Sequence, residues 1–126
     1  CLFLKVIYEI FCRRQFLKEV RMKTLHDLLA RRDEFVHGVI ETHGKNGHAI
    51  RSRILWLEIS GDEIEFTVEK TVVAKDCKWE LVTEPHPRNS ICYKADTKTT
   101  EGFRPQFEIP NGWVIIYPNT DSVRIP

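Results

Sequence analysis

The stretch "AIRSRILWLEISGDEIEFTVEKTVV", residues 49–73, decides the fold, because two apolar-rich segments flank the dipeptide Gly61-Asp62. Both segments are rich in β-branched and aromatic residues, which favour strands. A glycine at the first position of a two-residue loop is typical of a type II′ hairpin turn. We therefore expect residues 49–73 to form a long β-hairpin.

The position of this turn determines which residues of the hairpin lie opposite each other. Counting outward from it, three apolar pairs share one face: Ile59 with Ile64, Leu57 with Phe66, and Leu55 with Val68. Because side chains alternate across a strand, this agreement supports the register and predicts that this face is buried.

The opposite face of the hairpin mixes apolar and acidic side chains. The same register predicts three pairs there: Trp56 with Thr67, Ile54 with Glu69, and Glu58 with Glu65. An exposed apolar patch usually marks a contact surface. We expect this one to be covered by the N-terminal segment, by a later strand or by a second subunit.

A helix is predicted upstream of the hairpin, over residues 24–43. Thr24 and Asp27 resemble a capping box, and His43-Gly44 provides a stop signal at the other end. The apolar residues between them recur at helical spacing. They are Leu25, Leu28, Leu29, Phe35, Val36, Val39 and Ile40. We expect this stripe to cover the buried face of the hairpin.

The remaining strands are predicted downstream of the hairpin. Residues 77–84 and 90–95 resemble weaker strands, and a short strand is expected in 119–126. A second hairpin is expected in 103–118, with Pro110 in a type I turn followed by a left-handed bulge residue, Gly112.

Helices and strands do not alternate along the chain, so the expected class is α+β. The expected fold has one or two N-terminal helices packed on a curved, mainly antiparallel sheet of six or seven strands. A chain of 126 residues fits a single domain.

Residues 1–21 precede the only methionine, Met22. Residues 18–20 can be encoded by a nucleotide sequence that resembles a bacterial ribosome-binding site. On that interpretation, residues 1–21 are a translated leader, and the gene belongs to a bacterial environmental or mobile gene cassette. The alternative is a native N-terminal helical extension, because apolar residues recur there at helical spacing. The core is expected in 22–126.

Composition indicates an ordinary globular protein, with 42% hydrophobic and 29% charged residues. No apolar run is long enough to span a bilayer, and the first residues lack the marks of a signal peptide. The cysteines form no metal-ligand or CxxC spacing, which favours free thiols in a reducing cytoplasm. They are Cys1, Cys12, Cys77 and Cys92. We expect a cytoplasmic protein with no membrane association and no cofactor.

Charge is distributed unevenly along the chain. Residues 1–32 carry eight Lys/Arg against three Asp/Glu, and the rest carries eleven against fifteen. A basic N-terminal part is typical of an arm that binds nucleic acid. The alternative is that the basic and acidic parts form two faces of one domain that attract each other. Because the basic residues and the tryptophans do not interleave, nucleic-acid binding is the weaker interpretation.

The candidate ligand-binding residues form three groups. The curved sheet is expected to enclose a pocket for a small organic ligand. The first group, which would line it, is Trp56, Trp79 and Trp113. The second group is the facing carboxylates Glu58 and Glu65, which suit cation binding or acid–base chemistry, the alternative being a solvated sheet face. The third group alternates with prolines and either converges on a polar ligand or forms a surface turn. It consists of Glu84, His86 and Arg88.

Histidines supply two further candidate sites. His37 has Asp33 and Glu41 four residues away on either side, an arrangement that would orient a general base on one helix face. The alternative is a solvated helix pair. His43 and His48 flank a short turn and would make a weak metal site, a polar loop being the alternative.

The leading hypothesis is a small binding protein that acts on a small ligand or protein partner and self-associates as a homodimer. Nucleic-acid binding through basic N-terminal helices is the second hypothesis. A small hydrolase or isomerase that uses sheet carboxylates is the third. We find no catalytic motif, which favours a non-enzymatic role.

Overall fold

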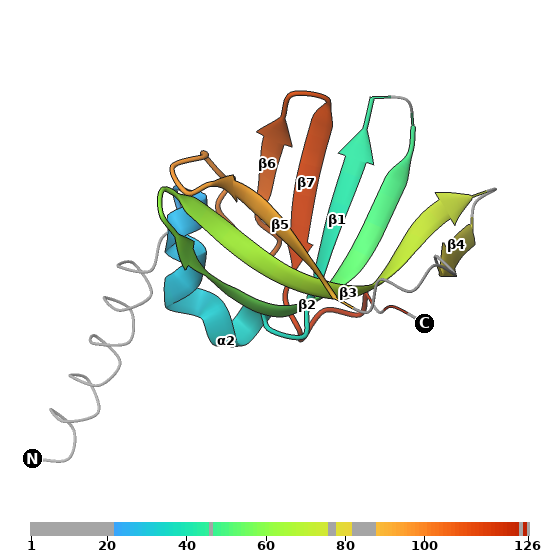
Figure 1. Cartoon of the computed structure of the whole chain (residues 1–126), viewed down its shortest axis with the longest axis horizontal. Coiled ribbons are helices and arrows are strands. Elements are labelled where there is room, and N and C mark those ends of the chain that lie inside the picture. Colours follow the sequence, from blue (N-terminus) through green and yellow to red (C-terminus); the bar gives the residue numbers. More distant parts are fainter. Residues whose placement is uncertain (1–21, 46, 76–77, 82–87, 124, 126) are drawn as a thin grey trace, which may run out of the picture.

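A computed structural model describes residues 22–45, 47–75, 78–81, 88–123 and 125. Two short helices, η1 (Leu25–Arg31) and α2 (Arg32–Phe35), precede the strands (Figure 1). The strands are β1 (Val39–Gly44), β2 (Ala49–Ser60), β3 (Glu63–Lys75), β4 (Lys78–Leu81), β5 (Asn89–Lys94), β6 (Gln106–Ile109) and β7 (Gly112–Tyr117). This confirms the α+β class. The helices expected within 1–21 lie outside the described residues.

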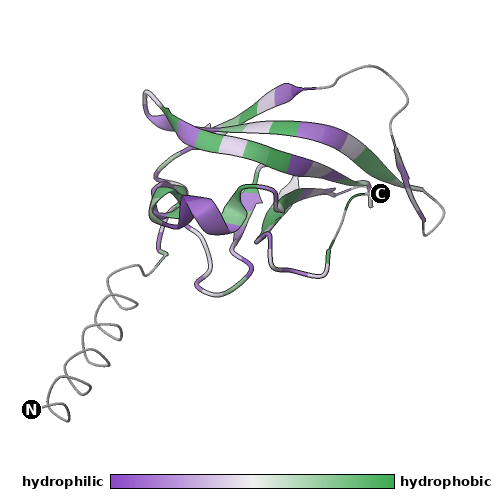
Figure 2. Ribbon diagram, turned by 90° about the horizontal axis from the view of Figure 1, so that it is seen from below, coloured by the Kyte–Doolittle hydropathy of each residue, from purple (hydrophilic) through white to green (hydrophobic). Residues whose placement is uncertain are grey.

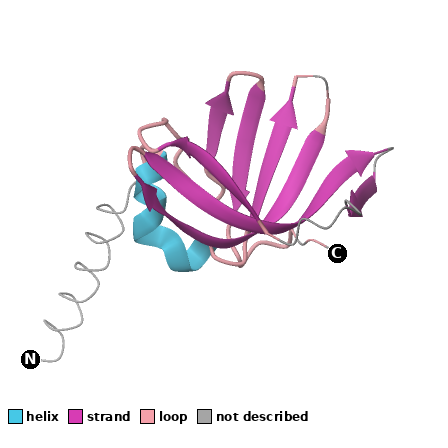
Figure 3. Ribbon diagram, in the orientation of Figure 1, coloured by secondary structure: helices cyan, strands magenta, loops and turns pink. Residues whose placement is uncertain are grey.

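The strands form one antiparallel sheet in the order β4-β3-β2-β1-β7-β6. Strand β3 is long enough to pair with β5 through its first half and with β4 through its second half. The sheet bends strongly, so that β5 comes over the inner side near β6 (Figure 3). The rings of Tyr93 on β5 and Phe107 on β6 meet edge to face, with centroids 5.0 Å apart.

The first hairpin turns at Gly61-Asp62, as predicted. Leu57 pairs with Phe66 in the predicted register, and both are fully buried. Ile59 pairs with the buried Ile64 as predicted, but it is itself 40% exposed, so the predicted face is not buried along its whole length. Trp56 pairs with Thr67 on the other side and is 43% exposed, so it points outward as expected.

Further from the turn, the predicted pairing is wrong by one position. Val68 pairs with Ile54, not Leu55, because a β-bulge lies between Ile54 and Trp56. Ile54 is fully buried, whereas Leu55 is only half-buried. A bulge places an extra residue in one strand and increases its bend. The bulge thus lets β2 curve around the core while Ile54 and Leu57, on either side of it, both stay inside.

The helix predicted over 24–43 is wrong in its second half. Its capping box forms, since the Asp27 carboxylate accepts the backbone N–H of Thr24 at 3.0 Å. The helical segment ends at Phe35, however, and β1 begins at Val39. Residues 39–43 include a β-branched run, which favours a strand over a helix.

Two contacts with the C-terminal part of the chain fix the point where the helix ends. Gly38 passes so close to β7 that a Cβ there would lie 2.2 Å from the carbonyl oxygen of Tyr117. The side-chain amide of Asn119 donates to the carbonyl oxygens of Asp33 at 2.8 Å and Val36 at 3.0 Å. These bonds satisfy carbonyl groups that a helix end leaves unpaired.

The main core lies between the helical segment and the concave side of the sheet. Its buried members come from the helical segment with the preceding Met22 and from strands β1, β2, β3, β6 and β7. They are Met22, Leu25, Leu28, Phe35, Ile40, Ile54, Leu57, Ile64, Phe66, Val68, Phe107, Val114 and Ile116. The helical part of the predicted stripe, residues 25–35, therefore covers the predicted face of the hairpin, whereas Val39 and Ile40 belong to β1. Figure 2 shows the corresponding alternation of hydrophobic and hydrophilic residues along the strands.

The second hairpin joins β6 to β7 through Pro110-Asn111, as predicted. Gly112 is required for a different reason than expected. Its φ is 158°, not the left-handed helical value, and a Cβ there would lie 1.7 Å from the carbonyl oxygen of His43 on β1. The strand expected in 119–126 is absent from its described part, residues 119–123 and 125, which forms a turn, a bend and irregular structure.

In the part of the chain that the structure describes, no helix has the length and apolar character needed to cross a membrane.

Candidate functional site

The side of the sheet opposite the main core carries a cluster of polar and aromatic side chains. Along β1, Ile40 belongs to the core, so its neighbours Val39 and Glu41 face the other way. The register extends this surface onto β2 and β7. We call it the second face, and it consists of Val39, Glu41, His43, Arg51, Arg53, Trp113, Ile115 and Tyr117.

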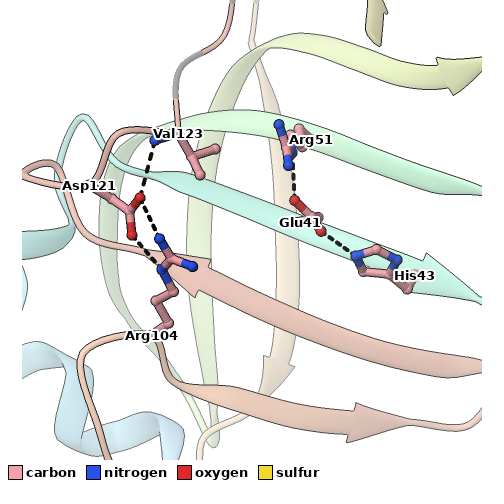
Figure 4. A network of polar contacts seen from close by, with 6 residues as sticks. All are labelled: Glu41, His43, Arg51, Arg104, Asp121 and Val123. Carbon is pink, nitrogen blue, oxygen red and sulfur yellow. Dashed lines mark hydrogen bonds and ion pairs between the residues drawn. The ribbon is translucent and has the colours of Figure 1, made fainter. Parts of the chain in front are cut away.

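Glu41 lies at the centre of the second face and is only 4% exposed. Its carboxylate accepts the Nε–H of Arg51, directly opposite on β2, at 2.5 Å. Its other oxygen pairs with Nε2 of His43, two residues further along β1 (Figure 4). A buried carboxylate needs such partners, because removing a charge from water is costly.

The two partners of Glu41 each stack on a tryptophan. The Arg51 guanidinium lies 4.0 Å from the ring centroid of Trp79 on β4. The His43 ring is parallel to that of Trp113, its register partner on β7, with centroids 4.8 Å apart. We call this continuous set, Trp79–Arg51–Glu41–His43–Trp113, the Glu41 row. Trp113 is 38% exposed, so the row opens to solvent at that end.

A second ion pair lies beside the row and holds the C-terminal segment. Arg104 donates through Nε and Nη2 to the buried carboxylate of Asp121, at 2.6 and 2.9 Å (Figure 4). Its guanidinium also lies 5.1 Å from the ring centroid of Tyr117. Hydrogen bonding to Arg104 lowers the pKa of Asp121. Burial and the charge of Glu41 raise the pKa of the Tyr117 phenol.

A hollow of about 310 Å³ continues the second face. It is lined by His37, Val39, Arg53, Asn119, Val123 and Ile125. Val39 and Arg53 are opposite each other on β1 and β2. The next opposite pair on the second face is Glu41 and Arg51. We call this space the Arg53 hollow. Nη2 of Arg53 pairs with the Glu69 carboxylate, while its Nε is buried with no partner among the described residues.

A wider, open hollow of about 640 Å³ lies near the turn of the first hairpin, where it includes Thr24, His26 and Ala95. Its main polar feature is the ion pair between Lys94 and Asp62, at 2.7 Å. Both side chains are exposed, and such surface pairs contribute little binding or stability. This hollow is a weaker candidate than the second face.

The structure separates the three predicted tryptophans. Trp79 and Trp113 lie at the two ends of the Glu41 row, whereas Trp56 lies elsewhere, with the Arg32 guanidinium 4.6 Å from its ring centroid. None of the three lines the Arg53 hollow or the wider hollow near the first hairpin turn. A ligand-binding role for each remains a prediction.

The predicted acidic residues have different surroundings. Glu58 and Glu65 lie opposite each other as expected, with Glu58 exposed and Glu65 half-buried. Glu84 and His86 lie outside the described residues. Arg88 is exposed, and its charge contributes to lowering the pKa of Glu69, behind the larger effect of Arg53.

The structure changes both histidine hypotheses. His37 is not on a helix face with Glu41, because it follows the helical segment in a left-handed conformation (φ 70°) while Glu41 belongs to β1. His43 pairs with Glu41. Across the described ranges, no group of three or more His, Cys, Asp or Glu side chains is placed to hold a metal ion.

Sequence reasoning missed Arg51, Arg53, Arg104 and Asp121 as site residues, and it placed Glu41 beside His37 on a helix face. Glu41 and His43 are two residues apart between β-branched neighbours, which is the spacing of one strand face. Interpreting residues 24–43 as one helix hid that signal. The pairing of Arg104 with Asp121 has no signal in the sequence, because it depends on how the chain folds back.

No protein-family model matches this chain, and neither the curated proteins nor the solved structures contain a match. The residues of the second face are therefore the evidence for function.

Proposed function

We propose that the protein is a binding protein that holds a small organic ligand on its second face, against the Glu41 row. The observation that carries this proposal is the buried Glu41 carboxylate, which orients Arg51 and His43 while each of these stacks on an indole ring. A hydrophobic pair would fill the same space with less desolvation cost. A charged row on a half-open surface therefore supports a recognition role.

The chemistry of the row favours a flat ligand with hydrogen-bond acceptors. Indole and guanidinium planes stack on planar rings, and the nitrogens of Arg51 that Glu41 does not engage supply N–H donors beside them. Glu41 holds these donors in place, so less conformational entropy is lost when a ligand binds.

Tryptophan fluorescence tests this proposal. A library of flat heteroaromatic compounds is titrated into the full chain and into Trp113→Phe, Trp79→Phe and Trp56→Phe variants. We expect ligand-dependent quenching to fall in the first two variants and to persist in Trp56→Phe, the matched control. Quenching that disappears only in Trp56→Phe would place the ligand elsewhere and contradict the proposal.

We propose self-association as a second role, because Trp56 is 43% exposed on the outer side of β2. Its ring stacks with Arg32, and a Trp–Arg pair on a surface is typical of interface centres. Light scattering after size-exclusion chromatography tests this. We expect a dimer that becomes a monomer in Trp56→Ser, and a strictly monomeric parent protein would refute the idea.

We also propose a cytoplasmic location and a bacterial, cassette-borne gene. Among the described residues the one cysteine, Cys92, is free, which fits a reducing compartment. Cell fractionation of the tagged protein tests the location. Nucleic-acid binding remains the alternative role, and affinity for an oligonucleotide that falls steeply with added salt would favour it.

A further inference from the structure

We infer that the Arg53 hollow binds a carboxylate, so that the ligand of the second face is a small carboxylic acid with an apolar or aromatic body. This inference rests on the proposed function, because the hollow and the Glu41 row belong to the same face. It adds the chemical class of the ligand and the residue that anchors it.

Arg53 has an unused donor at this position. Its Nη2 pairs with Glu69, but its Nε–H is buried without a partner in the described part of the chain. Nearly all buried polar groups in folded proteins are hydrogen-bonded, so an unpaired guanidinium N–H indicates a missing acceptor. A carboxylate oxygen is the acceptor that guanidinium geometry suits best.

The charges around the hollow favour an anion despite the presence of Glu69. The carboxylate of Glu69 is already engaged by Arg53, and the charge of Arg88 also acts on it. His37 adds a further nitrogen donor at the hollow, where it is held in its left-handed conformation by a backbone bond to Ile54 O at 2.8 Å. Strained backbone of this kind is concentrated at ligand sites.

The remaining walls of the hollow select an apolar body. Val39, Val123 and Ile125 line it, and its volume of about 310 Å³ suits a compact molecule. Small-molecule sites begin at roughly 300 Å³ and combine apolar walls with few polar groups. Inorganic anions would pair with the guanidinium but would make no contact with these apolar side chains.

The hollow and the Glu41 row are close enough for one ligand to contact both. Val39 and Glu41 are two residues apart on β1, which corresponds to about 7 Å along a strand. A carboxylate at Arg53 therefore places an attached ring beside Tyr117, the register partner of Val39 on β7, and toward Arg51. This arrangement fits the flat ligand proposed for the row.

Isothermal titration calorimetry with benzoate and its neutral counterpart benzamide tests the inference on the full chain. We expect benzoate to bind at least about tenfold more tightly than benzamide, because only the carboxylate pairs with Arg53. Inorganic phosphate is expected to compete at least about tenfold more weakly than benzoate. Equal affinities for benzoate and benzamide, or equal competition by phosphate, would overturn the assignment.

Variants locate the effect. Arg53→Gln is expected to weaken benzoate binding by roughly 10- to 100-fold, the range for losing a charged hydrogen bond. Arg53→Lys keeps the charge but loses Nε, so a smaller loss is expected. Glu69→Gln frees the guanidinium and is expected to tighten binding. Lys98→Gln, which removes an exposed cation outside the hollow, is the matched control and should bind like the parent protein.

The outcomes separate this inference from the proposed function. Benzoate binding that is unchanged in Arg53→Gln overturns the inference. If flat neutral compounds still quench Trp113 in that case, the proposed function stands. If no flat compound, charged or neutral, binds the folded parent protein, both fail. Circular dichroism of each variant confirms that lost binding is not lost folding.

Discussion

Glu41 and Arg51 face each other directly across β1 and β2, and the arginine Nε–H donates to the buried carboxylate at 2.5 Å. The same carboxylate engages His43 on its own strand. Through the rings stacked on these partners, contacts from one carboxyl group extend to Trp79 on β4 and Trp113 on β7. The Glu41 row thus joins side chains from four strands.

Replacing Glu41 by glutamine is expected to destabilise the protein by roughly 1–3 kcal/mol, because Arg51 loses its charged acceptor in a largely buried position. Urea unfolding followed by circular dichroism measures the change. Glu58→Gln is the matched control: this side chain is exposed, so a change within about 0.5 kcal/mol is expected. Equal effects of the two substitutions would contradict a structural role for the row.

A double-mutant cycle measures the direct coupling between Glu41 and Arg51. Glu41→Gln and Arg51→Gln are combined, and the free energies of unfolding are compared. Groups in direct contact show coupling of roughly 0.5–3 kcal/mol, whereas independent sites add. Additive effects would mean that the pair acts only through separate contacts.

Gly38→Ala is expected to destabilise the protein by about 1–3 kcal/mol, because the new methyl group would meet the backbone of β7. A Cβ at this position lies 2.2 Å from the Tyr117 carbonyl oxygen, and backbone cannot move aside as a flexible side chain can. Thermal or urea unfolding measures the loss. Gly47→Asn is the control, because the space around Gly47 is open and asparagine tolerates its positive φ.

Asp121→Asn is expected to remove a stabilisation that depends on pH. Because Arg104 lowers the folded-state pKa of Asp121 below its usual 3.8, the carboxylate stabilises the fold fully above that value. This contribution is lost as the pH falls through the lowered folded-state pKa. The difference in unfolding free energy between parent and variant should therefore be large at neutral pH and shrink in acid.

Urea unfolding at a series of pH values tests the Asp121 prediction, with Asp96→Asn, an exposed loop residue, as the control. A difference between Asp121→Asn and the parent protein that stays constant down to pH values well below 3.8 would show that the carboxylate charge is not responsible.

Leu28→Ala is expected to cost about 2–5 kcal/mol, because Leu28 is fully buried where the helical segment meets the main core. Leu29, its neighbour, is only partly buried and packs against the edge of that core. The same truncation at Leu29 should therefore cost clearly less. The two variants are compared by urea unfolding, and a reversed order would mean that η1 docks with a different face.

Short-range signals in the amino-acid sequence are sufficient to predict the local features of this protein. Glycine at position 61 and the period-two pattern on both sides set the turn and the pairing of Leu57 with Phe66, since both signals act between near neighbours. The capping box at Thr24 and the outward position of Trp56 follow from the same short-range rules.

Contacts between distant parts of the chain set the end of the helix, the position of the bulge in β2 and the pairing of charges. Gly38 ends the helical segment against Tyr117, and Asn119 caps it, although both partners come from the other end of the chain. Periodicity cannot distinguish a helix from a strand when the deciding contacts are distant in sequence. The Glu41 row exists for the same reason: four strands bring its members together, and its energy depends on burial that only the folded sheet provides.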